Sequence, residues 1–305
     1  MSDAFIKQLI IQAQEDESIY LITGDLGYSV LDEFQTKFPN RFINSGIAEQ
    51  SMMGLAAGLA STGKKVFVYS IGNFSTLRCL EQIRNDVCSM KLNVTVVSVG
   101  AGYAYGSQGY THHAIEDISV MRAMHGMKVY SPCDPQETQK VTQLICESTG
   151  PAYLRLGKSN EPAIHSGTID LTPNKFIEIV PGSDGTILFT GSIGRIAIQA
   201  ASELASLGIN TAVASCPFIS AHDVEYLRAA SERGLIVTLE EHILRGGFGS
   251  SILETLSHNR IQARVSIVAS ESKEISTVGN QEYLWGCNEL TVENIASRFL
   301  PRDSR

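Results

Sequence analysis

The first half of the chain alternates short apolar runs with longer segments of helical periodicity. The apolar runs have strand length and are apolar on both faces, which is typical of strands covered on each side of a parallel sheet. The expected strands are 19–22, 41–43, 66–69, 94–99, 128–130 and 152–156, and the expected helices are 1–8, 48–60, 77–90, 116–124 and 135–147. This order predicts one doubly wound α/β domain over residues 1–160.

The periodicity stops after residue 156, and prolines and glycines accumulate over residues 161–180, which predicts a linker. A second alternation then begins. Its expected strands are 186–189, 211–214, 235–239 and 265–268, and its expected helices are 195–207, 223–231, one beginning near 247, and 292–299. Residues 181–305 are therefore predicted to form a smaller α/β domain. The predicted fold class is α/β with two doubly wound domains, the first built on a mostly parallel sheet.

Composition and charge narrow the possible partners. The chain has 305 residues, of which 43% are hydrophobic and 18% charged, so it can bury two cores of ordinary size. A formal net charge of -8 argues against nucleic acid or an acidic membrane as the main partner, because both need a basic surface. The six cysteines are scattered without a CxxC pair, and the first residues lack the order of a signal peptide. We expect a cytoplasmic protein with reduced thiols.

The segment Asn44–Ser51 leaves the expected strand 41–43, turns at Gly46 and enters the helix 48–60. Open α/β sheets bind ligands at such turns, because free backbone N–H groups and the positive end of the helix dipole meet there. Glu49 lies in the first helical turn, where a carboxylate often serves only as a dipole partner worth about 0.3–1 kcal/mol. Position alone leaves Glu49 open between these two roles.

A glycine-rich loop follows the expected strand 94–99 and ends in adjacent histidines, His112 and His113. Loops at the carboxyl edge of a parallel sheet carry function more often than packing. Metal binding is disfavoured, because adjacent histidines point in different directions and no cysteine or carboxylate stands at ligand spacing. We predict proton transfer or hydrogen bonding to a substrate oxygen, since histidine titrates near neutral pH.

Three other features invite a functional interpretation. The segment Gly100–Gly106 follows a strand, but its glycine spacing does not match a dinucleotide-binding fingerprint. The segment Gly191–Gly194 has no P-loop lysine and is predicted to be a tight turn between a strand and a helix. Arg155 ends the strand 152–156 at the carboxyl edge, where it could form a domain-interface ion pair or bind a phosphate or carboxylate. Position does not decide between these alternatives.

Taken together, these segments resemble one family closely, the transketolases, and within it the C-terminal half in its split form. Segment 38–50 resembles the strand, turn and helix entry of that family's pyrimidine-binding domain. Segments 106–112, 116–118, 121–123 and 153–155 are similar to later signatures of that domain, and segments 240–242 and 246–249 are similar to the family's C-terminal domain. The resemblance covers the whole chain.

The resemblance implies transfer of a two-carbon ketol unit from a ketose to an aldose with thiamine diphosphate as cofactor. In that family the glutamate matched by Glu49 hydrogen-bonds N1′ of the cofactor's aminopyrimidine ring and promotes its activation. Phe74 matches the aromatic residue that packs on this ring, and His112 matches a histidine that contacts the reacting oxygens of the donor. Ser29 and Arg155 match residues that bind the substrate phosphate.

Three positions depart from the family pattern. Gln108 stands where many transketolases carry an aspartate that binds a donor hydroxyl, so it is expected on the substrate wall. Gly100 stands where a phosphate-binding histidine is usual, and Leu80 stands where tyrosine is common. These departures leave Glu49 in place and alter the substrate wall, so we expect an unusual or unphosphorylated sugar as substrate.

The Gly-Asp-Gly motif that binds the diphosphate and Mg²⁺ in this family is absent, and Gly24-Asp25-Leu26 does not match it. The resemblance therefore implies an N-terminal partner subunit that carries the diphosphate-binding domain and all metal ligands. It further implies a heterotetramer in which this subunit also pairs with itself. The alternatives are the β subunit of a 2-oxo acid dehydrogenase, a protein of the deoxyxylulose-phosphate synthase type, or a non-catalytic partner subunit.

Overall fold

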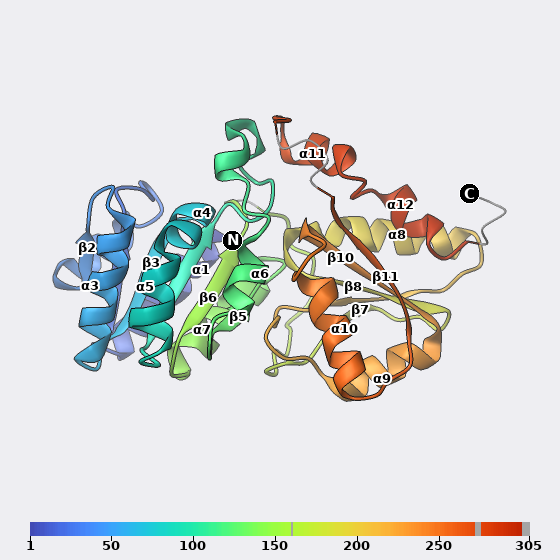
Figure 1. The fold of residues 1–305 in the computed structure, drawn as a ribbon, viewed down its shortest axis with the longest axis horizontal. Helices are drawn as coiled ribbons and strands as arrows, with labels where there is room; N and C mark the ends of the chain where they lie inside the picture. The colour runs from blue at the N-terminus through green and yellow to red at the C-terminus, as the bar shows by residue number, and fades with distance from the viewer. Residues whose placement is uncertain (160, 272–275, 301–305) are drawn as a thin grey trace.

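Six parallel strands form the first sheet, which lies on the left of Figure 1. The computed structural model describes residues 1–159, 161–271 and 276–300. The strands stand in the order β2-β1-β3-β4-β6-β5. Their bounds are β1 (Ile19–Thr23), β2 (Phe42–Asn44), β3 (Lys65–Ile71), β4 (Val94–Val99), β5 (Lys128–Tyr130) and β6 (Ala152–Leu156). The expected parallel sheet is confirmed.

The helices of this domain are α1 (Ser2–Glu15), α2 (Asp32–Lys37), α3 (Glu49–Ser61), α4 (Gly72–Ser75), α5 (Leu80–Gln82), α6 (Asp117–Arg122) and α7 (Pro135–Glu147). The segment 77–90, predicted as one helix, is instead divided into the 3₁₀-helix η2 (Leu77–Cys79), α5 and the π-helix η3 (Ile83–Cys88). Short 3₁₀-helices also occur at η1 (Pro39–Arg41), η4 (Gly106–Gln108) and η5 (Tyr110–His112). Helical irregularities of this kind are frequent at functional sites.

Consecutive residues of β3 show how the first sheet is covered. Val66 and Val68 belong to a core cluster that includes Met52 of α3, whereas Phe67 and Tyr69 belong to a second cluster that includes Phe5 of α1. Side chains alternate across a strand, so helices cover both faces of the sheet. This double burial explains why the strands appear as continuous apolar runs in the sequence.

The second sheet contains five strands in the order β11-β10-β8-β9-β7. Its strands are β7 (Ile177–Val180), β8 (Gly185–Phe189), β9 (Ala212–Ser215), β10 (Leu235–Ile243) and β11 (Arg264–Ser270). Its helices are η6 (Gly191–Ile193), α8 (Gly194–Ser206), α9 (Val224–Arg233), α10 (Phe248–His258), α11 (Gln281–Cys287) and α12 (Val292–Ser297). Strand β7 is antiparallel to β9 and lies inside the stretch predicted as a linker. Helix α11 was not predicted from the sequence.

The 240–249 signature of the second domain has a structural explanation. Glu240 accepts hydrogen bonds from the backbone N–H groups of Phe248 at 2.5 Å and Gly249 at 2.8 Å, so it satisfies free donors at the start of α10. A Cβ atom at Gly247 would lie 2.2 Å from Glu240 Oε2, which only glycine avoids. Burial raises the pKa of Glu240 to about 7, although these two backbone hydrogen bonds act in the opposite direction.

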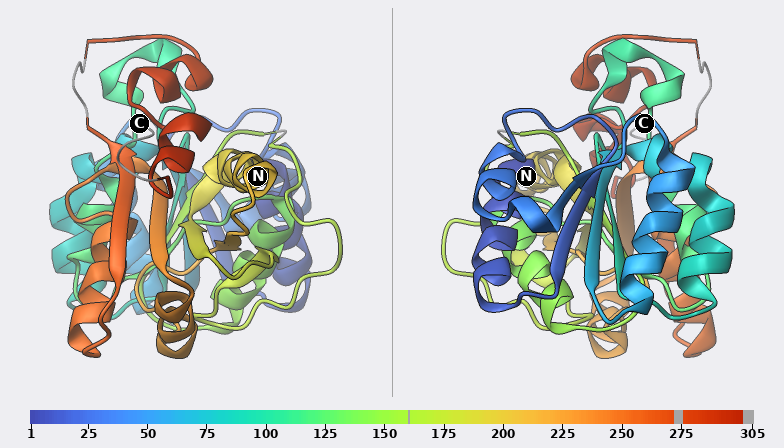
Figure 2. Two further views of the ribbon diagram at one scale, coloured as in Figure 1. Left: turned by 90° about the vertical axis from the view of Figure 1, so that its right-hand side faces the viewer. Right: turned by 90° about the vertical axis from the view of Figure 1, so that its left-hand side faces the viewer.

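The two domains pack against each other beside the loop of residues 100–113. In this loop, Gly106 accepts a hydrogen bond from the N–H of Gly279 at 3.4 Å, and Leu284 of α11 lies against it. Both views of Figure 2 show the loop, in green, beside α11, in red. The loop that was predicted to be functional is therefore held by both domains. Among the described residues, no helix has the length and apolar character needed to cross a bilayer.

Candidate active site

Glu49 is the first residue of α3, at the carboxyl end of β2. Gly46 adopts a φ of 71°, a left-handed conformation that favours glycine and lets the chain turn after the strand. Asn44 Oδ1 accepts hydrogen bonds from the N–H groups of Gly46 and Asp25, both at 3.0 Å, and so ties this turn to the loop after β1. The side chain of Glu49 is only 4% exposed, and a buried carboxylate requires a partner.

Arg78 supplies that partner and connects Glu49 to Phe74. Its Nη1 donates a hydrogen bond to Glu49 Oε2 at 2.8 Å, and its guanidinium carbon lies 4.4 Å from the centroid of the Phe74 ring. Phe74 belongs to α4, which follows β3 directly. A carboxylate has several acceptor positions, so Glu49 retains the capacity to accept a further donor through Oε1. The carboxylate and the aromatic ring thus share one edge of the sheet.

The loop after β4 brings His112 to the same place. The rings of His112 and Phe74 meet edge to face with their centroids 5.2 Å apart. Asn73 Nδ2 donates hydrogen bonds to the backbone oxygens of Thr111 at 3.2 Å and His113 at 2.9 Å, which holds the loop against α4. Burial, with a smaller contribution from His113, lowers the pKa of His112. The imidazole is therefore neutral near pH 7 and can accept a proton.

The two adjacent histidines have different roles in the structure. His113 is 3% exposed, its Nε2 lies 3.1 Å from the backbone oxygen of Gly106, and its ring packs against Tyr103. His112 is only half-buried and faces Phe74. His113 therefore stabilises the loop, and His112 is the member of the pair that a ligand can reach.

Ser29 and Gln108 are both exposed in loops at the carboxyl edge of the first sheet. Ser29 lies after β1 and has a φ of 67°, which is an uncommon conformation for a residue other than glycine. Backbone strain of this kind clusters at functional sites and costs on the order of 1–3 kcal/mol. Gln108 ends η4, in the loop that carries His112.

Arg155, which the resemblance assigns to phosphate binding, forms a buried ion pair in the structure, and its phosphate role stays a prediction. The Arg155 side chain is only 2% exposed, and its Nε donates a hydrogen bond to Asp117 Oδ2 at 2.7 Å. Its Nη2 donates to the backbone oxygens of Ala114 at 2.8 Å and of Glu241, in the second domain, at 3.0 Å. Burial opposes the charge of Arg155, but Asp117 outweighs this effect and raises the pKa of the guanidinium. Arg155 is a buried ion-pair residue at the domain interface.

Sequence reasoning missed Arg78. The segment 77–90 was predicted as one continuous helix, in which an exposed arginine is an ordinary surface residue. The interruption of that helix at η2 turns Arg78 toward Glu49, from which it is separated by 29 positions in the sequence. The one local signal was its spacing of four residues from Phe74.

Comparison with known proteins agrees with this geometry. Residues 1–163 match the pyrimidine binding domain of transketolase, and residues 175–286 match the transketolase C-terminal domain. The chain belongs to the transketolase family. The two matches together cover most of the chain, and both sheets lie within them. The predicted fold class and the predicted family are confirmed.

The similar members of the transketolase family include separate subunits. An apulose-4-phosphate transketolase subunit of Phocaeicola vulgatus is 37% identical over 300 residues, which cover 97% of this chain and 95% of the relative. A 6-deoxy-6-sulfo-D-fructose transketolase subunit of a Clostridium species is 35% identical over 261 residues, which cover 85% of this chain and 81% of the relative. Both relatives are named as subunits of transketolases.

A solved structure of a split-gene transketolase, described as an inactive β4 tetramer, superimposes with a TM-score of 0.87. The two sequences are 34% identical, and the superposition covers 97% of this chain and 95% of the chain in that structure. The 1-deoxy-D-xylulose-5-phosphate synthase of Pelotomaculum thermopropionicum is also 34% identical, but this chain covers only 48% of its length. The synthase alternative therefore fits only in part.

Replacing Arg78 with methionine should lower the activity of the assembled enzyme by about tenfold, because Glu49 loses a charge-assisted hydrogen bond worth about 1.5–3 kcal/mol. The subunit should still fold, with some loss of stability, since the Arg78 side chain is 46% exposed but Glu49 loses its partner. The measurement is kcat and the cofactor concentration for half-maximal activity, with Arg84→Met as the control. Arg84 is exposed in η3, and its Nη1 donates a hydrogen bond to Asn85 Oδ1. Equal kinetics of the two variants would contradict the role of Arg78.

Proposed function

We propose that this chain is the C-terminal subunit of a two-component, thiamine diphosphate-dependent transketolase that transfers a two-carbon ketol unit from a ketose to an aldose. The observation that carries this proposal is the buried carboxylate of Glu49, which is held by Arg78 beside the ring of Phe74. We assign cofactor binding to Glu49 and Phe74, and we assign to His112 hydrogen bonding and proton transfer at the donor's reacting oxygens.

The residues present fit the pyrimidine end of the cofactor. A desolvated carboxylate binds a protonated ring nitrogen strongly, and an aromatic side chain offers the ring a stacking surface. When bound, thiamine diphosphate supplies the nucleophile and the electron sink for cleavage of the sugar's carbon–carbon bond. The task of Glu49 is to accept a hydrogen bond from N1′ and hold the proton there, while neutral His112 exchanges a proton with the substrate.

An N-terminal partner subunit is part of the proposal. Large apolar side chains are exposed in the segments that carry Glu49 and Arg78, with Ile47 78% exposed, Leu55 40% and Leu77 41%. Exposed apolar side chains around a binding site indicate a surface that another polypeptide covers. We assign the diphosphate and Mg²⁺ ligands to that partner, and we propose a heterotetramer located in the cytoplasm.

The substrate is proposed to be an unusual sugar, because Gln108 lies exposed on the active-site loop where many transketolases carry an aspartate. The named relatives act on a phosphorylated sugar and on a sulfonated sugar. We propose Ser29 and Arg155 for such an anionic group, and we add Lys158 as a further cation near the same loop. Lys158 Nζ lies 5.9 Å from the ring of Tyr105 in the loop that leads to Gln108, and it lines a cavity of about 340 Å³.

Reconstitution tests the proposal. This chain alone should bind thiamine diphosphate and Mg²⁺ weakly in isothermal titration, and ketol transfer should appear only after addition of the N-terminal subunit. A panel of phosphorylated, sulfonated and unsubstituted ketoses identifies the donor. In the same assay, Lys158→Met should raise KM for the anionic donors while leaving kcat nearly unchanged. Sub-micromolar cofactor binding by the isolated chain, or no transfer by the complex with any ketose, would contradict the proposal.

A further inference from the structure

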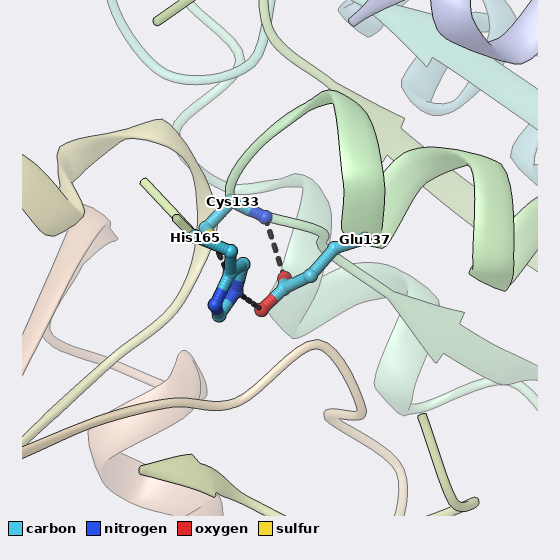
Figure 3. Close-up of side chains that lie close together, drawn as sticks. All are labelled: Cys133, Glu137 and His165. Atoms are coloured by element: carbon cyan, nitrogen blue, oxygen red, sulfur yellow. Dashed lines mark hydrogen bonds and ion pairs between the residues drawn. The ribbon is translucent and has the colours of Figure 1, made fainter. Parts of the chain in front are cut away.

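Three side chains of the kinds that bind metals meet at the amino end of α7, and none of them belongs to the candidate active site. Figure 3 shows Cys133 from the loop before this helix, Glu137 from its first turn and His165 from the segment between the domains. Their ligand atoms all lie within 4.8 Å of one another. His165 Nε2 is 2.9 Å from Glu137 Oε1 and 3.7 Å from Cys133 Sγ.

The backbone around these residues is rigidly positioned. Asp134 caps α7 by accepting the N–H of Glu137 at 2.9 Å through Oδ1. Its other oxygen accepts the N–H groups of Ile164 and His165, both at 3.0 Å. Cys133 N–H donates to Glu137 Oε2 at 2.8 Å. Since short contacts fix all three side chains, little rearrangement would be needed to enclose an ion.

The arrangement does not fit a proton relay. In a Cys-His-carboxylate relay the thiol and the carboxylate bind opposite ring nitrogens, so that the ring passes a proton between them. Here the thiol and the carboxylate both face Nε2. Ligand atoms that converge on one point are arranged as they are around a metal ion. The cluster is also buried, with Cys133 1%, Glu137 0% and His165 8% exposed.

The local charge also favours a cation. Asp134 and Glu137 are both fully buried, and the ion pair that the structure shows for Glu137 within its described residues is with His165. Buried carboxylates are paired or coordinate metal ions, and a divalent ion bound here would supply positive charge beside both.

We propose that Cys133, Glu137 and His165 bind one divalent transition-metal ion of the zinc class, which fastens the interdomain segment to α7. Thiolate, imidazole and carboxylate are the ligands that Zn²⁺ takes in tetrahedral sites, and a water molecule would fill the fourth position. Binding replaces the proton of the Cys133 thiol and the proton on His165 Nε2 by bonds to the metal, both protons pass to solvent, and no electron is transferred. The site is independent of the thiamine diphosphate chemistry proposed above.

Cobalt(II) is a suitable probe, because thiolate-to-Co²⁺ charge transfer gives an absorption band that carboxylate and imidazole ligands do not give. The reduced, metal-free full-length chain is titrated with CoCl₂ and then with ZnCl₂. We expect one Co²⁺ per chain with a thiolate band that Zn²⁺ abolishes. Cys133→Ser should lose the band, and His165→Ala should weaken Co²⁺ binding at least about tenfold.

Cys146→Ser is the matched control, since Cys146 is a buried cysteine of α7, the helix that carries Glu137, but lies outside the cluster. This variant should bind Co²⁺ as the wild type does. A folded wild-type chain without a thiolate band would overturn the proposal, as would a band that persists in Cys133→Ser. If Cys133→Ser does not fold, the wild-type spectrum and the His165→Ala affinity decide.

Discussion

Replacing Glu49 with glutamine is expected to lower kcat of the reconstituted enzyme by about 10²–10⁴-fold, the usual contribution of a positioned acid or base. The change keeps the volume and one acceptor oxygen but removes the negative charge that would hold a proton on the cofactor ring. The variant subunit should still assemble with its partner, because Glu49 is one residue at the end of α3. Steady-state transfer kinetics with saturating cofactor measure the effect.

Glu81→Gln is the control for this experiment. Glu81 is an exposed glutamate in α5, close in sequence to Arg78, and its replacement should leave kcat unchanged. Full activity of Glu49→Gln at saturating cofactor would mean that the carboxylate serves only the helix dipole or the ion pair with Arg78. The chain would then contribute to the enzyme as a non-catalytic subunit.

Replacing Arg155 with alanine is expected to lower the free energy of unfolding of this chain by about 3–5 kcal/mol, because it leaves the buried charge of Asp117 without its partner. Asp117 is 0% exposed, and its Oδ2 also accepts the hydroxyl of Tyr153 at 2.5 Å. The same change removes the hydrogen bond to Glu241 O across the domain interface. Urea unfolding of the isolated subunit measures the loss.

Arg195→Ala separates this effect from that of an ordinary ion pair. Arg195 pairs with Glu282 on the surface, their side chains being 43% and 69% exposed, so its removal should cost less than about 1 kcal/mol. If Arg155→Ala unfolds like the wild type and instead raises KM for an anionic sugar, the buried ion pair does not stabilise the fold and Arg155 binds the substrate.

Both sheets could be predicted from the apolar runs, because a strand that is covered on both faces consists of consecutive apolar residues. The start of the second domain was harder to predict. Strand β7 is a four-residue edge strand whose side chains are mostly half-buried, so it resembles a linker in the sequence. The segment 77–90 has helical periodicity throughout, and its division into η2, α5 and η3 comes from packing around the site.

The candidate site could be predicted only where its residues belong to short motifs. Glu49, Phe74 and His112 each follow a strand of one parallel sheet, and the carboxyl ends of such strands share an edge. Arg155 also ends a strand, yet its side chain points into the domain interface. Being at the sheet edge limits where a residue lies but does not fix the direction of its side chain.

The sequence by itself determined the alternation of strands and helices, the two-domain order, the family and the residues whose chemistry suits thiamine diphosphate. These are local properties, because they depend on hydrophobic periodicity and on short motifs. Only the tertiary structure decided which charges are paired. Arg78 meets Glu49 across 29 positions, Arg155 meets Asp117 across 38, and His165 meets Glu137 across 28. Hydrogen bonds and ion pairs act over a few ångströms in space, and sequence separation carries no information about that distance.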